Sequence, residues 1–186
     1  SCPSGRKAIL TLAVRGKLVE RISKEGEGIE ILTKKSIDTI SPSDAPTLPS
    51  HWAWTSLGSI VTSMDSGWSP QCLQEPALPN EWGVLKTTSV QMLEYREEEN
   101  KALPSVLDPR PNAEVMDGDI LITGAGPQNR VGILCVARPT RPKLMISDKI
   151  IRFHLILEID PDYAALALST GYSGKIIESL KSGMAA

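Results

Sequence analysis

The N-terminal part of the chain has the hydrophobic spacing of an amphipathic helix. Between about residues 5 and 24, apolar residues recur every three or four positions, at Ile9, Leu10, Leu12, Ala13, Leu18, Val19 and Ile22. This spacing places them on one face of a helix. Gly16 lies inside the segment and lowers helix stability by about 1 kcal/mol relative to alanine, so the pattern allows a break there. We predict a helical N-terminal segment.

A stretch rich in proline and serine, SPSDAPTLPSHW at residues 41–52, follows this segment. Such composition is typical of a linker, because proline and serine disfavour regular secondary structure. We therefore predict a domain boundary near residue 45. Residues 1–45 would form the helical segment and linker, and residues 46–186 a second domain.

The second domain combines short apolar strands with long irregular loops. GDILIT and VGILCVA are typical of β-strands joined by GAGPQNR, and KLMISDKIIRFHLILEI contains at least one more strand. Near the C-terminus, Asp160 suits a helix N-cap and Pro161 the first helical position, so two short helices separated by Gly171 are expected. The pattern predicts an α/β (α+β) fold: a curved, mixed β-sheet with short flanking helices and long loops.

The segment WGVLKTTSVQ, residues 82–91, is predicted to be a strand with polar groups on both faces. A half-buried strand normally alternates apolar and polar residues. Here one face carries Val84, Lys86, Thr88 and Val90, and the other carries Leu85, Thr87, Ser89 and Gln91. Two explanations stay open: the hydroxyls are buried against backbone partners, or one edge or face of the strand contacts a ligand.

The composition, 41% hydrophobic and 23% charged residues, is that of a soluble globular protein. No run approaches the roughly 18 to 20 apolar residues of a membrane span. The apolar stretch from Ile9 to Leu18 is interrupted by Arg15, Gly16 and Lys17, which argues against a signal peptide. We expect a cytoplasmic protein that does not contact a membrane.

The cysteine and histidine content argues against a disulfide framework and against a zinc site. Cys2, Cys72 and Cys135 lie far apart and have no Cys-x-x-Cys spacing, and the chain has only two histidines. We expect inert thiols, no metal and no cofactor.

The net charge of −2 does not by itself indicate nucleic-acid binding, but the charge is unevenly distributed. Residues 1–35 carry eight basic and four acidic residues, residues 36–100 carry two and nine, and residues 101–186 carry ten and nine. A local basic face is compatible with this distribution, because only charges near the phosphates contribute to binding.

The glycine-rich segment GAGPQNRVG, residues 124–132, resembles a phosphate-binding loop only superficially. It lacks the Lys-Ser/Thr pair of a Walker A motif and precedes a strand, so no helix N-terminus is available to hold a phosphate. It is best interpreted as a connection between strands. Its Gln128, Asn129 and Arg130 are nevertheless residue types that pair with base edges. Base contact and ordinary solvated loop polarity stay equally open.

Motifs that would support catalysis are missing from the sequence. There is no nucleophile elbow, no His-Glu-x-x-His, no Asp-Pro-Pro-Tyr motif of amino-methyltransferases, and no carboxylate cluster with a nearby lysine that suggests a nuclease. Asp117 and Asp119 flank Gly118 at the start of a strand, where turn chemistry explains them. We interpret EYREEEN, residues 94–100, as a solvated charged face. The chain is therefore not expected to be an enzyme.

Several separated motifs resemble the target recognition domain of type I restriction–modification specificity (S) subunits. They are GWSPQCLQEPALPNEWGVLKTTSVQ, ENKALP, GDILITGAGPQNRVGILC, RPKLMISDKIIRF and SGMA, while AILTLAVRGKLV resembles the segment that often precedes such a domain. The resemblance implies that residues 46–186 are a non-catalytic DNA target recognition domain. Such a domain reads one half of a bipartite target in the major groove of double-stranded DNA, while modification (methyltransferase) and restriction subunits carry the catalysis.

The chain departs from the family pattern in two ways. A full specificity subunit has two recognition domains joined by long helices, whereas this chain has room for one. We expect a fragment, or a half-length subunit that pairs with a second recognition domain or forms a homodimer. Relatives also often carry an arginine where this chain has Gly124 in TGAGP. If that arginine contacts DNA, the contact is lost here.

The resemblance implies candidate DNA-binding residues of two kinds. Candidates for contacts to phosphate or guanine are Lys86, Lys101, Arg130, Lys143 and Lys149. Candidates for hydrogen bonds to bases or backbone are Thr87, Thr88, Gln91, Gln128 and Asn129. Phosphate contacts position such a domain and base contacts specify the sequence. Two alternatives stay open: a domain that only bridges protein subunits, and a fragment of a restriction–modification enzyme with catalysis of its own.

Overall fold

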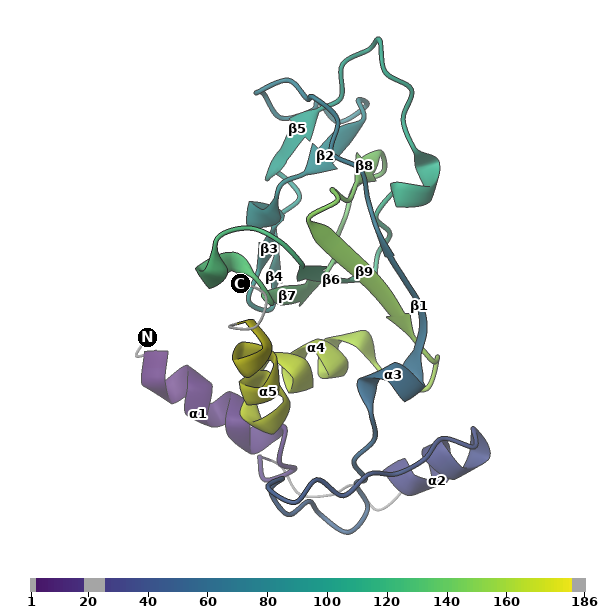
Figure 1. Ribbon diagram of the computed structural model, residues 1–186, viewed down its shortest axis with the longest axis vertical. Coiled ribbons are helices and arrows are strands. Elements are labelled where there is room, and N and C mark those ends of the chain that lie inside the picture. The colour runs from purple at the N-terminus through teal and green to yellow at the C-terminus, as the bar shows by residue number, and fades with distance from the viewer. Residues whose placement is uncertain (1–2, 19–25, 182–186) are drawn as a thin grey trace.

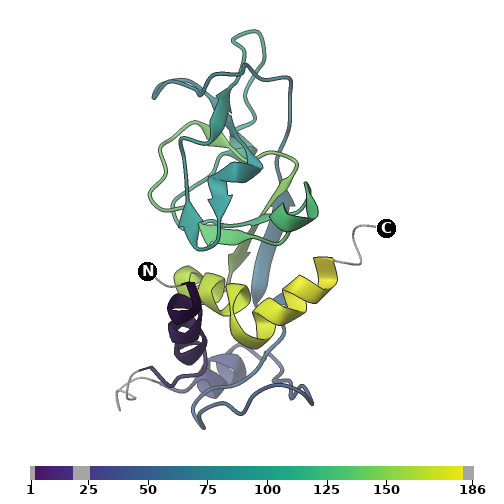
Figure 2. The same ribbon diagram turned by 90° about the vertical axis from the view of Figure 1, so that its left-hand side faces the viewer.

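A computed structural model of the protein describes residues 3–18 and 26–181. The molecule is elongated, with the strands at one end and most of the helices at the other (Figures 1 and 2). Among the described residues, helices and strands occur in different parts of the fold, and the strands form open sheets. The predicted α+β class is therefore confirmed.

The N-terminal segment is helical, as the hydrophobic spacing predicts, but it is shorter. Helix α1 (Pro3–Ala13) ends before Gly16, which adopts a positive φ of 62°. The predicted break at this glycine is present, and residues 19–24 of the predicted helix lie outside the described residues. A second helix that we did not predict, α2 (Gly28–Lys34), follows. No described helix is both long enough and apolar enough to cross a membrane.

The larger sheet has the strand order β1-β9-β6-β7, and all its neighbours are antiparallel. Its strands are β1 (Val61–Ser66), β9 (Ile150–Leu155), β6 (Ile120–Thr123) and β7 (Leu134–Val136), and the short helix α3 (Leu57–Ile60) leads into β1. The three strands predicted in GDILIT, VGILCVA and the segment after Lys143 are thus confirmed. The side chains of β6 alternate: Ile120 and Ile122 pack toward helix α4 (Pro161–Ser169), while Leu121 packs into the other core.

The second sheet contains the one parallel pair among the described strands. Its order is β5-β2-β8, in which β2 (Gly83–Leu85) is antiparallel to β5 (Asn100–Ala102) and parallel to β8 (Leu144–Met145). A two-stranded hairpin, β3 (Val90–Gln91) with β4 (Glu94–Tyr95), lies between the two sheets. The prediction described one mixed sheet, and the structure divides the strands among three.

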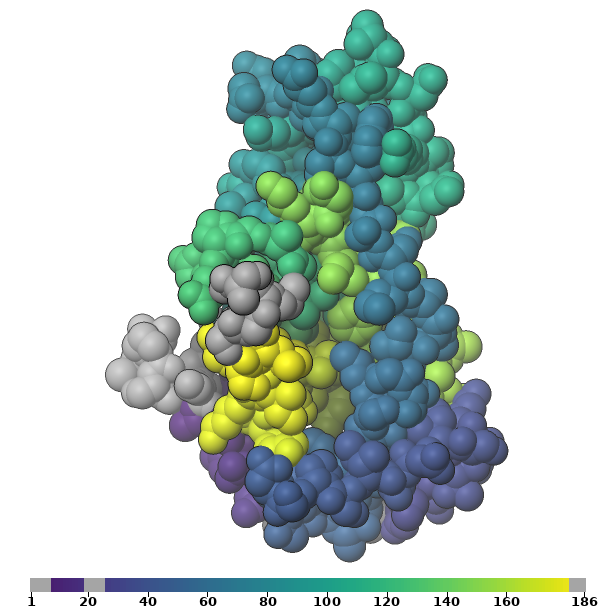
Figure 3. Space-filling view, viewed as in Figure 1, coloured from purple at the N-terminus to yellow at the C-terminus, as the bar shows by residue number. Residues whose placement is uncertain are grey.

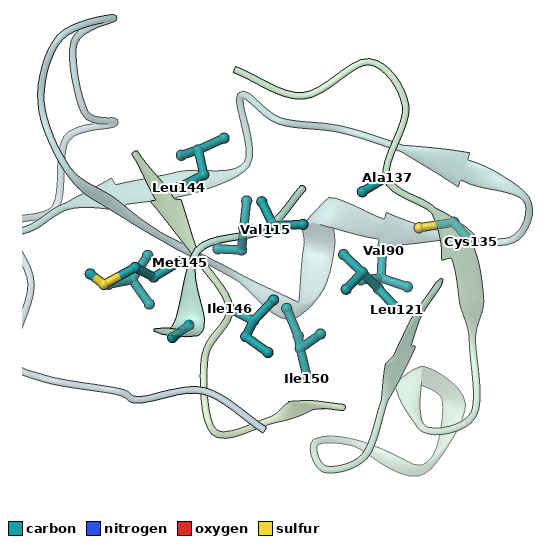
Figure 4. Close-up of a cluster of buried hydrophobic side chains, with 12 residues drawn as sticks. Val90, Val115, Leu121, Cys135, Ala137, Leu144, Met145, Ile146 and Ile150 are labelled. Carbon is teal, nitrogen blue, oxygen red and sulfur yellow. The ribbon is translucent and has the colours of Figure 1, made fainter. Parts of the chain in front are cut away.

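A buried hydrophobic cluster joins these sheets. Leu121 and Cys135 from the larger sheet meet Leu144 and Met145 from the second sheet, with Val90 of the hairpin also in the cluster (Figure 4). All five side chains are completely shielded from solvent. Burial on this scale fixes the loops between the strands relative to one another, because the core transmits any displacement.

The prediction of one continuous strand over residues 82–91 is wrong. Strand β2 ends at Leu85, and the chain then forms a 3-10 turn, η1 (Thr87–Ser89), before β3 begins. The backbone carbonyl of Lys86 accepts a hydrogen bond from the Ser89 amide at 2.9 Å, which closes the turn. The polar middle of the segment is therefore a turn between two apolar strand ends.

The two C-terminal helices are those that the sequence predicts. The side chain of Asp160 caps α4 by accepting a hydrogen bond from the Tyr163 amide at 2.7 Å, and Pro161 is the first helical residue. Gly171, with a φ of 61°, separates α4 from α5 (Gly171–Lys181). The Tyr172 hydroxyl donates to Asp44 at 2.7 Å, so the linker contacts these helices. The domain boundary near residue 45 stays a prediction.

Candidate nucleic-acid interface

An open groove of about 610 Å³ lies at the strand-rich end of the molecule. Its walls are residues 69–74, the end of β2 with η1, the start of β5, and the loop between β8 and β9. Half of the predicted DNA-binding residues line this groove, namely Lys86, Thr87, Thr88, Lys101 and Lys149. The fold thus brings together residues that are up to 63 positions apart in the sequence.

The charge of the groove is positive although the net charge of the chain is negative. Its lining contains three lysines, Lys86, Lys101 and Lys149, and one carboxylate, Glu99. The Lys86 ammonium is paired with Glu99 at 2.6 Å, and the Lys101 ammonium donates to the Gln74 side chain at 3.2 Å. Lys149 is exposed and has no ion pair with any described residue. Two lysines are therefore available to a polyanion without breaking an ion pair.

The turn η1 is fixed by Arg130, which comes from the distant 3-10 turn η3 (Gln128–Arg130). The Arg130 guanidinium donates to the backbone carbonyls of Thr87 at 2.7 Å and Val90 at 2.8 Å, and to the side chain of Gln91 at 3.1 Å. Gln91 in turn donates to the Thr88 carbonyl at 2.7 Å. Two predicted contact residues, Arg130 and Gln91, thus do not line the groove but hold the backbone of the turn that forms its wall.

The loop that carries η3 exposes the other two predicted base contacts. The side chains of Gln128 and Asn129 are exposed and have no hydrogen-bond partner among the described residues. In the space-filling view this green loop bulges between the strand-rich end and the yellow helix α5 (Figure 3). The Gly124 amide donates to the Lys149 carbonyl at 2.9 Å, so the loop begins beside the groove.

Gly124, where the family resemblance led us to expect an arginine, is tightly packed. A Cβ atom at this position would lie 2.8 Å from Cδ1 of Ile151, the flexible end of that side chain, and 3.8 Å from the Lys149 carbonyl oxygen. A larger residue therefore requires Ile151 to change its rotamer, and its side chain would start next to Lys149.

Lys143 is one of the predicted contact residues that do not line the groove. Its ammonium donates to the carbonyl of Asn80 at 2.9 Å, and its backbone amide donates to Glu114 at 2.6 Å. The residue has a φ of 65°, a conformation that non-glycine residues rarely adopt. These contacts give Lys143 a structural role in its own loop that requires no contact to DNA.

The interpretation of residues 94–100 as a solvated charged face is wrong for several of them. Asn100 is 3% exposed and accepts from the Ala77 amide, and Glu97 accepts from the Arg141 amide at 2.7 Å. Glu99 accepts from both Lys86 and Thr88, and these hydrogen bonds, the one from Lys86 first, hold the pKa of its carboxyl below the ordinary value. Glu99 therefore belongs to the groove and stays ionised at neutral pH.

A partly buried ionic network that the sequence analysis missed joins β1, β9 and the start of β6. The Arg152 guanidinium donates to Asp65 at 2.9 and 2.5 Å and lies 3.3 Å from the buried Asp119. Asp119 also contacts His154 at 2.6 Å, and His154 contacts Ser63, its partner across the strands, at 2.8 Å. The signal was an arginine inside the apolar strand IIRFHL, since a buried charge requires a partner.

The prediction that turn chemistry explains Asp119 is therefore incomplete. Its carboxylate does accept from the Met116 amide at 2.9 Å, and Gly118 has a positive φ of 94°, as such a turn requires. The same carboxylate also anchors Arg152 and His154. The network lies in the sheet and holds its strands, and its residues do not line the groove.

Comparison with known proteins shows a similarity over nearly the whole chain. The chain is 48% identical over 201 residues to the type I restriction enzyme EcoEI specificity subunit of Escherichia coli. The alignment covers 97% of this chain and 34% of that subunit, so the chain spans about one third of the length of this curated relative. No protein-family model matches the chain.

Proposed function

Because the chain is a homologue of part of a type I restriction enzyme specificity subunit, we propose that it binds double-stranded DNA and recognises its sequence. It would read one half of a bipartite target, with residues 46–186 as the target recognition domain. The observation that carries this proposal is the basic groove, which gathers five residues predicted from the sequence as DNA contacts.

The lysines of the groove supply the sequence-independent part of the binding. Lys101 and Lys149 are the groove cations without a carboxylate partner among the described residues, so they meet phosphate oxygens at little cost. Each phosphate that a lysine neutralises releases condensed counterions, and binding therefore weakens as salt is added. A module with this few contacts binds weakly by itself, and the net charge of −2 weakens it further.

Sequence recognition needs hydrogen-bonding groups next to these phosphate contacts. Thr87 and Thr88 lie in the groove wall, and Gln128 and Asn129 project from the neighbouring loop with unused amide groups. Asparagine and glutamine pair with adenine, and threonine contacts the thymine methyl or a hydrogen-bonding group. The rigid support from Arg130 favours such a role, because base readout requires side chains that are held in place.

The assembly that we propose places catalysis elsewhere. The chain would act as a non-catalytic component in the cytoplasm, together with a modification (methyltransferase) subunit and a restriction subunit. A second recognition domain, or a second copy of this chain, would supply the other half of the target. Neither cofactor nor metal is proposed for this chain.

A mobility-shift assay with a pool of random duplexes at low salt tests the proposed function. We expect the chain to shift part of the duplex pool, and we expect this shift to weaken as salt is added. A chain that binds the modification subunit but shifts no duplex would instead be a bridging domain. Incubation with plasmid, magnesium, ATP and labelled S-adenosylmethionine completes the test, and turnover by the chain alone would refute the non-catalytic role.

A further inference from the structure

Glu99 is the one carboxylate in the lining of the groove, where it is paired with Lys86. Its backbone carbonyl accepts a hydrogen bond from the Lys86 amide at 2.9 Å, which ties the residue to the end of β2. Its side chain is 33% exposed, so part of the carboxylate faces the open groove. A negative charge here needs an explanation, because the groove otherwise suits a polyanion.

The orientation of this carboxylate is fixed through one of its two oxygens. Oε2 accepts from the Lys86 ammonium at 2.6 Å and from the Thr88 hydroxyl at 2.6 Å. Neither of these bonds uses Oε1. An ionised carboxylate only accepts hydrogen bonds, so Oε1 is an acceptor that the protein holds at a defined place in the groove.

A phosphate and a carboxylate repel each other, so Glu99 disfavours DNA backbone in its immediate vicinity. Duplex DNA offers a matching donor only on its bases. In the major groove, cytosine presents its 4-amino group as a donor, while adenine presents a donor beside the N7 acceptor. A carboxylate therefore fits cytosine. Opposite adenine, the remaining lone pairs of the carboxylate would face the N7 acceptor, which is unfavourable.

We propose that Glu99 determines specificity by accepting a hydrogen bond from the 4-amino group of a cytosine in the DNA target. Lys86 and Thr88 are positioning residues in this arrangement, because both orient the carboxylate, and Lys86 also compensates its charge. The inference rests on the proposed function and adds to it one base and the residue that recognises that base.

The test compares duplexes selected from a random pool by the full chain and by two variants of neighbouring glutamates. Glu99→Gln keeps the shape of the side chain but adds an amide donor, and glutamine pairs with adenine. We expect the preference for cytosine over adenine at one target position to fall about fivefold or more, with the other positions unchanged. Glu98→Gln removes the same charge from an exposed residue outside the groove lining and should select the wild-type sequence.

A second variant keeps the test valid if Glu99→Gln does not fold. Glu99→Asp retains the charge but retracts the carboxylate, and it should lose the preference for cytosine without gaining one for adenine. If Glu99→Gln and Glu99→Asp select the wild-type sequence, Glu99 only neutralises Lys86 and the inference is wrong. If the wild-type chain enriches no sequence, the proposed function fails, and this inference fails with it.

Discussion

Arg130 donates a hydrogen bond to the backbone carbonyl of Thr87 at 2.7 Å, although the two residues are 43 positions apart. The same guanidinium reaches the Val90 carbonyl and the Gln91 side chain, so one residue of the η3 loop holds the η1 turn. Two surfaces that we propose to meet DNA, the wall of the groove and the exposed loop, are therefore mechanically joined.

Replacement of Arg130 by alanine should lower the free energy of unfolding by about 1 to 3 kcal/mol, because the partly buried backbone carbonyls of Thr87 and Val90 lose their donor. Lysine should restore little of this loss, since a single ammonium cannot reproduce the fork of a guanidinium. Urea denaturation measures both effects. Asn129→Ala, at the exposed neighbouring residue, is the control and should stay within about 0.5 kcal/mol of wild type. Equal stability of the Arg130 and Asn129 variants would contradict the structural role.

The ion pair of Asp65 with Arg152 should make the stability of the fold depend on acid pH. The hydrogen bond from Arg152 is the main reason that the pKa of Asp65 lies below its ordinary value of 3.8. A carboxyl with a depressed folded-state pKa stabilises the fold fully above its unfolded pKa, and this contribution is lost as the pH falls through the folded pKa. We expect the thermal midpoint of wild type to fall below about pH 4.

The Asp65→Asn variant is the comparison for this pH dependence. It should be less stable than wild type at neutral pH, where the ion pair is intact, and the difference should narrow as the pH is lowered toward 2. Thermal melts across this pH range measure the difference. A constant difference between the two proteins at every pH would show that the ion pair does not contribute in this way.

Gly124→Arg should strengthen DNA binding if loop 124–130 faces the duplex. The new side chain starts beside the Lys149 carbonyl, and one added phosphate contact makes the salt dependence steeper by about one unit. The displacement of Ile151 should cost about 1 to 3 kcal/mol of stability, as for other overpacked sites. Gly124→Ala separates the steric cost from the charge. Unchanged affinity and salt slope in a folded arginine variant would place this loop away from DNA.

Local patterns in the sequence predicted those elements whose causes are local. The cap formed by Asp160 and Pro161 and the strand in GDILIT depend on neighbouring residues only, so both were predictable. The end of β2 at Leu85 was not, because the turn after it is held by Glu99 and by Arg130. Contacts over such sequence distances cannot be inferred from periodicity.

In the candidate site, too, the sequence indicated the type of residue needed but not where the fold places each residue. The chemistry of Lys101 and Lys149 indicated phosphate contacts, and the fold brings both to one groove. Arg130 and Lys143 have the same chemistry, yet the structure uses their side chains for backbone carbonyls. Glu99 was missed because it lies in a run of glutamates, where only its pairing with Lys86 distinguishes it.

The central claim, that DNA backbone binds in this groove, is tested most directly by the salt dependence of a Lys101→Ala/Lys149→Ala variant. These two lysines are chosen because Lys86→Ala would leave Glu99 unpaired and change the groove in a second way. Lys34→Ala/Lys175→Ala removes the same charge from exposed positions on α2 and α5 and serves as the control. Affinity for one duplex is measured at several salt concentrations. The quantity compared is the slope of the logarithm of the binding constant against the logarithm of the salt concentration, which is negative. We expect this slope to become shallower by about two units in the groove variant, at about 0.9 per lost phosphate contact. It should stay at the wild-type value in the control. Identical slopes for the groove variant and wild type would contradict the claim.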